Sequence, residues 1–354
     1  MSGARVILWW GRSDPEYSRN RIVRRLLAEE GWRIRDFRPR IRLFAPLEAD
    51  WAVRERPDLV WVPCFRQRDL EAARAWSSRR KVPLVFDPLI SSYDKQVDER
   101  GKYRPESRRA GRILRWETAL FRAADRVLAD TPEHARYFTD TFGLPAEKVS
   151  VVPVGAEESL FFPGESPGRP VSGPVEVLFF GSFIPLQGPQ VIAGAARLYH
   201  GPPVAWRFIG DGPLLPECRR LAKGLENVRF DPPVPYARLA GEIRRADILL
   251  GIFGATPKSA RVIPNKVYQA MACGKPVVTR RSPAYPPGLE ERGGSGISWV
   301  EPGNPEALTA AVASLAGDAS NLAGRGTASR ATYEEFFSMA TVRTMLRQAL
   351  TGLC

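Results

Sequence analysis

Short apolar runs alternate with stretches of helical period along the whole chain. The runs are rich in β-branched and aromatic residues, and they predict strands at residues 6–10, 32–37, 59–63, 82–87, 127–130, 149–154, 175–181, 205–210, 228–231, 247–253, 276–280 and 297–300. Between them lie stretches that predict amphipathic helices, among them 19–30, 70–80, 105–124, 132–142, 188–199 and 213–224. This alternation is typical of α/β proteins with parallel sheets.

A segment rich in Pro, Gly and Ser, residues 162–174, interrupts the alternation after the sixth predicted strand. We therefore expect two doubly wound, Rossmann-like domains, 1–164 and 165–330. The remaining segment, 331–354, contains a long amphipathic helix, 331–350, that is expected to pack back across the linker. In such sheets ligands bind outside the carboxyl ends of the strands, so two facing domains predict an interdomain cleft as the ligand site.

The composition excludes several classes of protein. Four widely spaced cysteines and two histidines argue against a zinc site and fit a reducing, cytoplasmic setting. The uncharged stretch 177–196 contains Gly, Pro and Gln residues that would break a membrane-spanning helix, and the first residues lack a secretory apolar region. Lys and Arg exceed Asp and Glu by 52 to 39, a net charge of +13, but no nucleic-acid-binding motif accompanies the excess.

The strongest chemical signal lies at residues 251–278. A buried strand is followed by a polar loop, and Pro264 is expected as the first residue of a helix that ends before Gly274. Free backbone N–H groups and the helix dipole favour an anion there, and Lys258, Arg261 and Lys266 add positive charge. The pattern predicts a diphosphate site, with a solvated helix start as the alternative.

Two glycine turns reinforce this interpretation. Gly181 follows one predicted strand, and Gly210 and Gly212 follow the next. Glycine lets the backbone approach a ligand closely, although such a turn is often only a tight connection. Three turns on one edge of a sheet favour a nucleotide site, with the base expected near residues 231–236.

The motifs FFGSFIPLQG, FIGDGP, ADILLGIFG and IPNKVYQAMACGKPVV, in this order and at this spacing, resemble the C-terminal half of retaining glycosyltransferases of family 4. The segment that begins ADRVLADTPEHARYF resembles the region joining the two domains of that family, so the similarity covers about residues 120–315. The resemblance implies the GT-B fold, a nucleotide-sugar donor bound by the C-terminal domain and an acceptor bound by the N-terminal domain. It also implies metal-independent transfer with retention of configuration and no cofactor besides the donor.

The chain departs from the family pattern in two places. The family's two glutamates, eight residues apart, correspond here to Arg261 and Gln269, and the usual Arg and Lys of the Gly181 loop are missing. The chain thus resembles a subset with an IPNK pattern, in which cations stabilise the departing diphosphate. The resulting catalytic candidates are Lys266, Arg261 and Asp87. The donor-binding candidates are Gly181, Ser182, Gln187, Gly210, Gly212, Phe253, Gly254, Lys258, Ser259, Asn265 and Gln269.

The N-terminal half supplies the acceptor candidates, which are Arg12, Ser18, Arg19, Asn20 and His134. Four of them follow the first strand in a loop that contacts acceptor and donor phosphate in the resembling fold. Structural alternatives exist: Ser18 and Asn20 could cap a helix, Asp87 could cap a turn, and a lone histidine is usually a surface or core residue.

Two basic segments, 12–42 and 100–126, contain ten basic residues against five acids and nine against three. The second also reads as an amphipathic helix, which fits an anionic, lipid-linked acceptor or peripheral contact with the inner face of a membrane; the alternative is a solvated face.

The sequence therefore predicts a glycosyltransferase of carbohydrate biosynthesis that acts on a glycan, lipid-linked or small-molecule acceptor. The alternatives are a nucleotide-sugar epimerase of the same fold, which the two histidines and the missing glutamate pair oppose, and a non-catalytic nucleotide-sugar or polyanion-binding protein.

Overall fold

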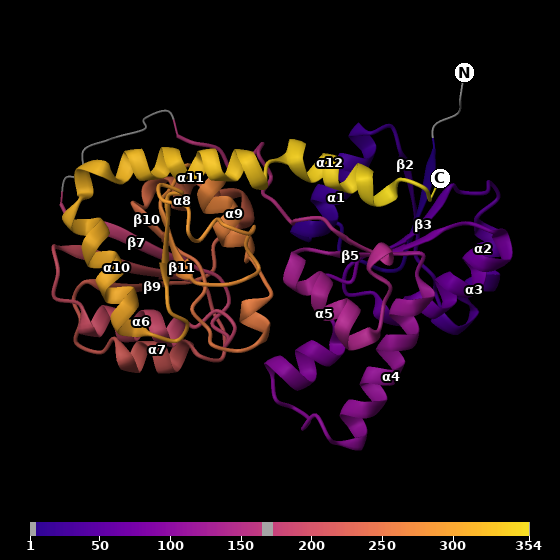
Figure 1. Ribbon diagram of the computed structural model, residues 1–354, viewed down its shortest axis with the longest axis horizontal. Helices are drawn as coiled ribbons and strands as arrows, with labels where there is room; N and C mark the ends of the chain where they lie inside the picture. The colour runs from indigo at the N-terminus through magenta and orange to yellow at the C-terminus, as the bar shows by residue number, and fades with distance from the viewer. Residues whose placement is uncertain (1–4, 165–172, 354) are drawn as a thin grey trace. The chain divides into compact units, whose positions relative to one another are not determined.

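The computed structural model describes residues 5–164 and 173–353 (Figure 1). The chain divides into two compact units, Met1–Val154 with Val342–Cys354, and Gly155–Thr341. The first unit therefore ends ten residues before the boundary expected at 164. Most of the expected Pro-rich linker, residues 165–172, lies outside the described residues.

The first unit is built on a six-stranded parallel sheet with the order β2-β1-β3-β4-β5-β6. Its strands are β1 (Val6–Trp10), β2 (Arg33–Phe37), β3 (Leu59–Val62), β4 (Leu84–Phe86), β5 (Arg126–Ala129) and β6 (Val149–Val151). Its helices are α1 (Ser18–Glu29), α2 (Ala45–Ala52), α3 (Leu70–Arg80), α4 (Arg108–Ala123), α5 (Pro132–Phe142) and most of α12 (Met339–Leu350). The shorter helical segments η1 (Arg42–Phe44) and a π-helix, η3 (Asp94–Glu99), lie between them.

One core cluster of this unit lies between the sheet and helices α2 to α5, and α1 buries Ile22, Val23, Leu26 and Leu27 as well. Strand β3 is fully buried along its length, as expected for a parallel strand covered on both faces. Trp10 packs edge-on against Phe37 and also contacts Trp76 of α3. Phe121 of α4 joins this core through its stacking on Phe142 of α5.

The second unit repeats the architecture with the strand order β12-β11-β10-β7-β8-β9. Its strands are β7 (Val175–Phe180), β8 (Val204–Ile209), β9 (Val228–Asp231), β10 (Ile248–Leu250), β11 (Val277–Arg280) and β12 (Ile297–Val300). Its helices are α6 (Pro189–Leu198), α7 (Leu215–Leu221), α8 (Tyr236–Arg245), α9 (Asn265–Ala272), α10 (Pro305–Gly317) and α11 (Leu322–Phe336). Neighbouring strands of this sheet are parallel, as in the first, so the expected α/β class and doubly wound domains are confirmed.

The expectation of one helix over residues 331–350 is wrong. Helix α11 ends at Phe336 and α12 begins at Met339. Ser338 accepts a hydrogen bond from the Thr341 amide at 3.2 Å, and Glu158 accepts one from the Met339 amide at 2.9 Å. These acceptors satisfy N–H groups of a new first turn, which is why the chain begins a second helix there.

Helix α4 carries much of the second basic segment, and its apolar side belongs to the core. Leu120 and Phe121 are buried, and Leu114 and Trp116 pack against the same core cluster. Its amphipathic pattern is thus explained by packing within the unit. No helix within residues 5–164 and 173–353 has the length and apolar content needed to cross a bilayer.

Candidate functional site

The second sheet brings the predicted glycine turns to one edge. Strands β10, β7 and β8 are neighbours and run parallel, so their carboxyl ends lie together. Gly181 follows β7, Gly210 follows β8, and the loop from Gly251 to Gly254 follows β10. Strand β8 lies on one side of β7 and β10 lies on the other, so the strand order reverses direction between β7 and β10. Doubly wound sheets bind ligands at such a switch point.

Gly181 and Gly210 are each required to be glycine, but for different reasons. Both have positive φ, +137° and +141°. A Cβ on Gly210 would lie 2.0 Å from the Gly181 carbonyl oxygen, so that glycine is required by the packing of the two turns. A Cβ on Gly181 would instead lie 3.1 Å from Nζ of Lys266, so this glycine leaves space beside an amine.

Lys266, in the first turn of α9, has a buried side chain. Its side chain is 5% exposed, and Nζ lies 3.7 Å from the centre of the Phe179 ring. Nζ makes no hydrogen bond to any described residue, and neither does the buried Oε1 of Gln187 nearby. Desolvation lowers the pKa of the Lys266 ammonium well below its usual value. An anion placed beside Gly181 would supply the missing partner.

The loop between β10 and α9 holds most of the remaining donor candidates. Lys258 and Ser259 are buried within a short 3₁₀ turn, and Ser259 shares a hydroxyl hydrogen bond of 2.6 Å with Thr256. Arg261 is partly exposed directly after that turn. Asn265, rather than Pro264, is the first residue of α9. The three predicted cations therefore lie on one loop and the helix that follows it.

Gln269, also on α9, contacts the region expected to hold the base. Its Nε2 donates to the hydroxyl of Tyr236 at 3.5 Å, and the Tyr236 ring packs edge-on against Phe161. Asp231, in contrast, is held by ion pairs with Arg207 at 2.6 Å and Arg229 at 2.7 Å. The polar groups of Tyr236 and Gln269 thus lie near one another and take no part in the ion pairs of Asp231.

The remaining donor candidates contribute backbone at the same edge. Ser182 is exposed directly after Gly181, and Gly212 packs on the backbone of Phe183. Phe253 is buried, and its amide donates to the Gln187 carbonyl at 3.0 Å. The turns after β7 and β10 are therefore joined by a main-chain hydrogen bond.

The sequence interpretation missed Arg280, which holds the loop after β10 in place. It ends β11, is 7% exposed, and its Nη1 donates to the Gly254 carbonyl at 2.7 Å. Burial lowers the pKa of its guanidinium. The sequence did contain a signal for this role, because the apolar run 276–280 ends in an arginine. A charged side chain at the end of a buried strand needs a polar partner.

In the first unit, Arg19 and Asp87 form a buried ion pair. Arg19 Nε donates to Asp87 Oδ2 at 2.9 Å, with the two side chains 1% and 2% exposed. Nη1 of Arg19 also donates to the carbonyls of Val152 and Pro153, at 2.7 and 2.9 Å. The pair ties the start of α1 to the ends of β4 and β6, and gives both residues a structural role.

The other candidates of this loop differ in exposure. Ser18 is buried, and Tyr17 rather than Ser18 occupies the N-cap of α1, without a side-chain cap. Asn20 donates to the Asp14 carbonyl at 2.7 Å and accepts from the Cys64 thiol at 3.0 Å. Arg12 is exposed and donates to the Pro39 carbonyl at 3.0 Å.

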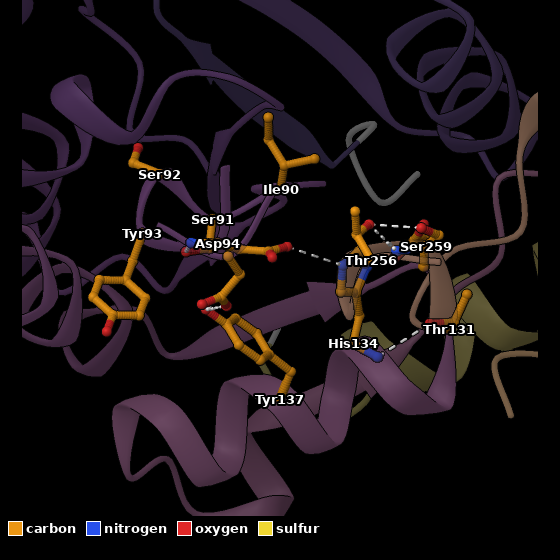
Figure 2. A network of polar contacts seen from close by, with 12 residues as sticks. Ile90, Ser91, Ser92, Tyr93, Asp94, Thr131, His134, Tyr137, Thr256 and Ser259 are labelled. Carbon is orange, nitrogen blue, oxygen red and sulfur yellow. Dashed lines mark hydrogen bonds and ion pairs between the residues drawn. The ribbon is translucent and has the colours of Figure 1, made fainter. Parts of the chain in front are cut away.

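His134 lies in the first turn of α5, is fully buried, and faces the Asp94 carboxylate (Figure 2). Nδ1 bonds to Asp130, and Nε2 lies 3.8 Å from the Asp94 carboxylate of the π-helix. Desolvation would lower the pKa of the imidazole, but the two carboxylates outweigh it and raise the pKa to about 9. His134 is therefore a charged core residue that links α5 to the π-helix.

A cavity of about 610 Å³ opens in the first unit and was not predicted as a site. It is lined by Arg42, Phe65, Arg66, Gln67, Arg68, Ser92, Gln96, Arg109, Ile113 and Trp116. The lining contains four arginines and no acidic residue, although Arg66 is paired with Asp69 behind it. Arg66 also lies against the Gly11 turn that follows β1, which places the cavity at the carboxyl edge of this sheet. Such a lining suits an anionic ligand.

Both halves of the chain match glycosyltransferase families. Residues 3–155 match the model described as "Glycosyl transferase 4-like domain", and residues 174–318 match "Glycosyl transferases group 1". Together with the fold, these matches show that the chain belongs to the glycosyltransferases with the GT-B fold.

Curated relatives agree with this assignment. The D-inositol 3-phosphate glycosyltransferase of Acidothermus cellulolyticus is 31% identical over 231 residues, which are 60% of this chain and 50% of the relative. The enzyme of the same name from Segniliparus rotundus is 31% identical over 258 residues, 67% of this chain and 55% of the relative. The chain spans about half the length of these relatives. They give no support to the epimerase or binding-protein alternatives.

Solved structures share the fold over nearly the whole chain. HepE from Anabaena, solved with UDP and glucose, gives a TM-score of 0.72 at 18% identity and covers 98% of this chain and 99% of its own. Sucrose-phosphate synthase from Thermosynechococcus elongatus gives 0.73 at 17% identity, with 97% and 98% covered. At these identities the likeness establishes the fold alone.

The buried ion pair predicts a large difference between two aspartate substitutions. Asp87→Ala leaves the Arg19 guanidinium buried with its charge uncompensated, so we expect the free energy of unfolding to fall by about 3–5 kcal/mol. Asp36→Ala removes the partner of Arg24, on the same helix but at the surface, and should cost at most about 1 kcal/mol. Urea denaturation measures both, and equal small losses would contradict the structural role of Arg19 and Asp87.

The raised pKa of His134 predicts a pH-dependent contribution to stability. Because the folded value, about 9, exceeds the ordinary 6.5, the contribution is complete below 6.5 and is lost as pH rises through the folded value. A pKa shift of this size corresponds to roughly 3 kcal/mol in the free energy of unfolding. His134→Gln should therefore destabilise the protein more below neutral pH than above the folded pKa. Unfolding curves for both proteins across this range test it, and a difference that is constant with pH would refute it.

Proposed function

We propose that the chain transfers a sugar from a nucleoside diphosphate sugar to an acceptor with retention of configuration and without a metal ion. The observation that carries the proposal is the buried, unpartnered Lys266 amine beside the Gly181 turn. Lys258 and Arg261 on the preceding loop add positive charge where a diphosphate would lie. UDP is our first choice of nucleotide, because HepE, which shares the fold, was solved with UDP and glucose.

The proposed reaction needs charge stabilisation more than a dedicated base. The bond between the anomeric carbon and the diphosphate oxygen breaks, and the acceptor oxygen bonds to that carbon on the same face. The acceptor proton passes to the departing diphosphate, whose negative charge Lys266 stabilises. Because the Lys266 side chain is buried, little water screens the attraction between its amine and the diphosphate, and this makes the stabilisation stronger. Gln269 and Tyr236 are proposed to hydrogen-bond the nucleoside.

We further propose that the acceptor carries an anionic group bound in the arginine-lined cavity of the first unit. Arg42, Arg68 and Arg109 reach the cavity from three different elements without an acidic residue among the lining. Guanidinium groups suit phosphate because they donate in pairs. The names of the inositol 3-phosphate glycosyltransferases are consistent with a phosphorylated acceptor.

Replacing Lys266 tests the donor site. Lys266→Met keeps the apolar stem and removes the charge, so we expect kcat/KM to fall about 10²- to 10³-fold with a UDP-sugar donor. Lys223→Met, an exposed lysine of the same unit, is the matched control. A panel of UDP-, GDP-, dTDP- and ADP-sugars identifies the donor, and NMR of the product reports the anomeric configuration. Tight donor binding without turnover of any donor would contradict the enzymatic proposal.

Replacing Arg109 tests the acceptor cavity. Arg109→Ala should raise the acceptor KM about tenfold and leave the donor KM unchanged, because the cavity lies in the first unit. Arg112→Ala, an exposed arginine one turn further along α4 and outside the lining, is the control. Steady-state kinetics with phosphorylated and dephosphorylated forms of one acceptor measure the effect. Equal preference for both forms by the unaltered enzyme would rule out the anionic acceptor.

A further inference from the structure

Large apolar side chains are concentrated on one exposed surface of the first unit. We define the η1–α2 patch as Ile41, Leu43, Phe44, Leu47 and Trp51, which are 55%, 81%, 51%, 59% and 90% exposed. Elsewhere in the described part of the chain, the exposed large hydrophobic residues are Phe65, Phe162 and Leu198, and at 44%, 46% and 42% they are less exposed than any residue of the patch. Apolar side chains gathered at this density on a surface mark an interaction site.

The patch results from a helix whose large apolar residues face solvent. Helix α2 turns its small residues inward, with Ala45 and Ala49 fully buried. Leu47 and Trp51, four residues apart, therefore share another face, which is exposed. An ordinary surface helix places its large apolar residues toward the core. Packing within the unit does not bury Leu47 and Trp51, so only a contact from outside the unit can cover them.

The charges around the patch indicate the partner. Arg38, Arg40 and Arg54 are exposed and have no ion-pair partner among the described residues. Two acids of the same segment are paired with other arginines, Asp50 with Arg79 and Arg80 and Glu55 with Arg33. The exposed Glu48 accepts from the Arg40 and Ile41 amides and keeps its negative charge beside the patch. The patch is thus apolar, and around it three arginines stand against the one carboxylate of Glu48, which leaves a net positive charge.

We propose that the η1–α2 patch docks on the interfacial layer of an anionic bilayer. Leu43, Leu47 and Trp51 enter the boundary between headgroups and acyl chains, where tryptophan is favoured. Arg38, Arg40 and Arg54 contact lipid phosphates. A symmetric dimer through the same surface would bring these arginines toward their own copies, which favours a lipid partner over a second chain. This inference goes beyond the transfer reaction and does not depend on it.

Vesicle flotation with the full chain tests the proposal. We expect binding to phosphatidylglycerol-containing vesicles and about tenfold weaker binding to phosphatidylcholine alone. Leu43→Ser with Leu47→Ser and Trp51→Ser should reduce binding about tenfold or more, and so should Arg38→Ser with Arg40→Ser and Arg54→Ser. Leu198→Ser, which removes an exposed apolar residue of the second unit, is the control and should bind normally.

Two further measurements distinguish lipid docking from unfolding and from self-association. Because the substituted residues are exposed, thermal unfolding should be nearly unchanged, and a triple variant with native unfolding but undiminished vesicle binding would overturn the proposal. Light scattering reports the oligomeric state. A dimer that dissociates on the apolar substitutions, with no vesicle binding by the unaltered chain, would assign the patch to self-association and would also overturn it.

Discussion

Parallel pairing of β10, β7 and β8 is the constraint on which the second unit depends. It brings three strand ends to one edge, and the turns that follow must pass within contact distance of one another. The approach of Gly210 to the Gly181 carbonyl leaves no room for a side chain. A compact wall of main chain results, with Lys266 as the charged side chain beside it. The amides of Gly181 and Gly210 are bonded to the carbonyls of Ile209 and Asp231, so the Lys266 amine, which lacks a hydrogen-bond partner, is the donor that the proposed function assigns to a phosphate oxygen.

The first unit contains charged side chains in two different settings. In the first unit, Arg19 is satisfied by a carboxylate and two carbonyls, and His134 lies between two carboxylates. These groups join neighbouring strands and helices and are complete without a ligand. Of the arginines that line the 610 Å³ cavity, Arg66 is paired with Asp69, while Arg42, Arg68 and Arg109 have no acid in the lining to neutralise them. The arginines of the proposed acceptor site therefore differ from Arg19 and His134 in their exposure to the cavity, not in their charge.

Periodicity predicted the strands and the doubly wound class because buried parallel strands are nearly continuous apolar runs, as in Leu59–Val62. It also located Lys266, because a helix start after a strand has a local signature. It missed α2, whose small residues face inward and whose large ones face out, the reverse of the usual pattern. The partner of Arg19 is 68 residues away and the cavity draws on four separate segments, so neither could be derived from local spacing.

Lys266 has a consequence for how this chain can vary over time. A buried amine without a hydrogen-bond partner weakens the folded state, and a methionine of similar length would fit the same space beside Phe179 at lower cost. Selection for stability alone would remove the lysine. Under the proposed donor binding, selection for function opposes selection for stability at this position, and a lineage that no longer binds the donor should lose this residue early, while the buried Arg19 pair persists.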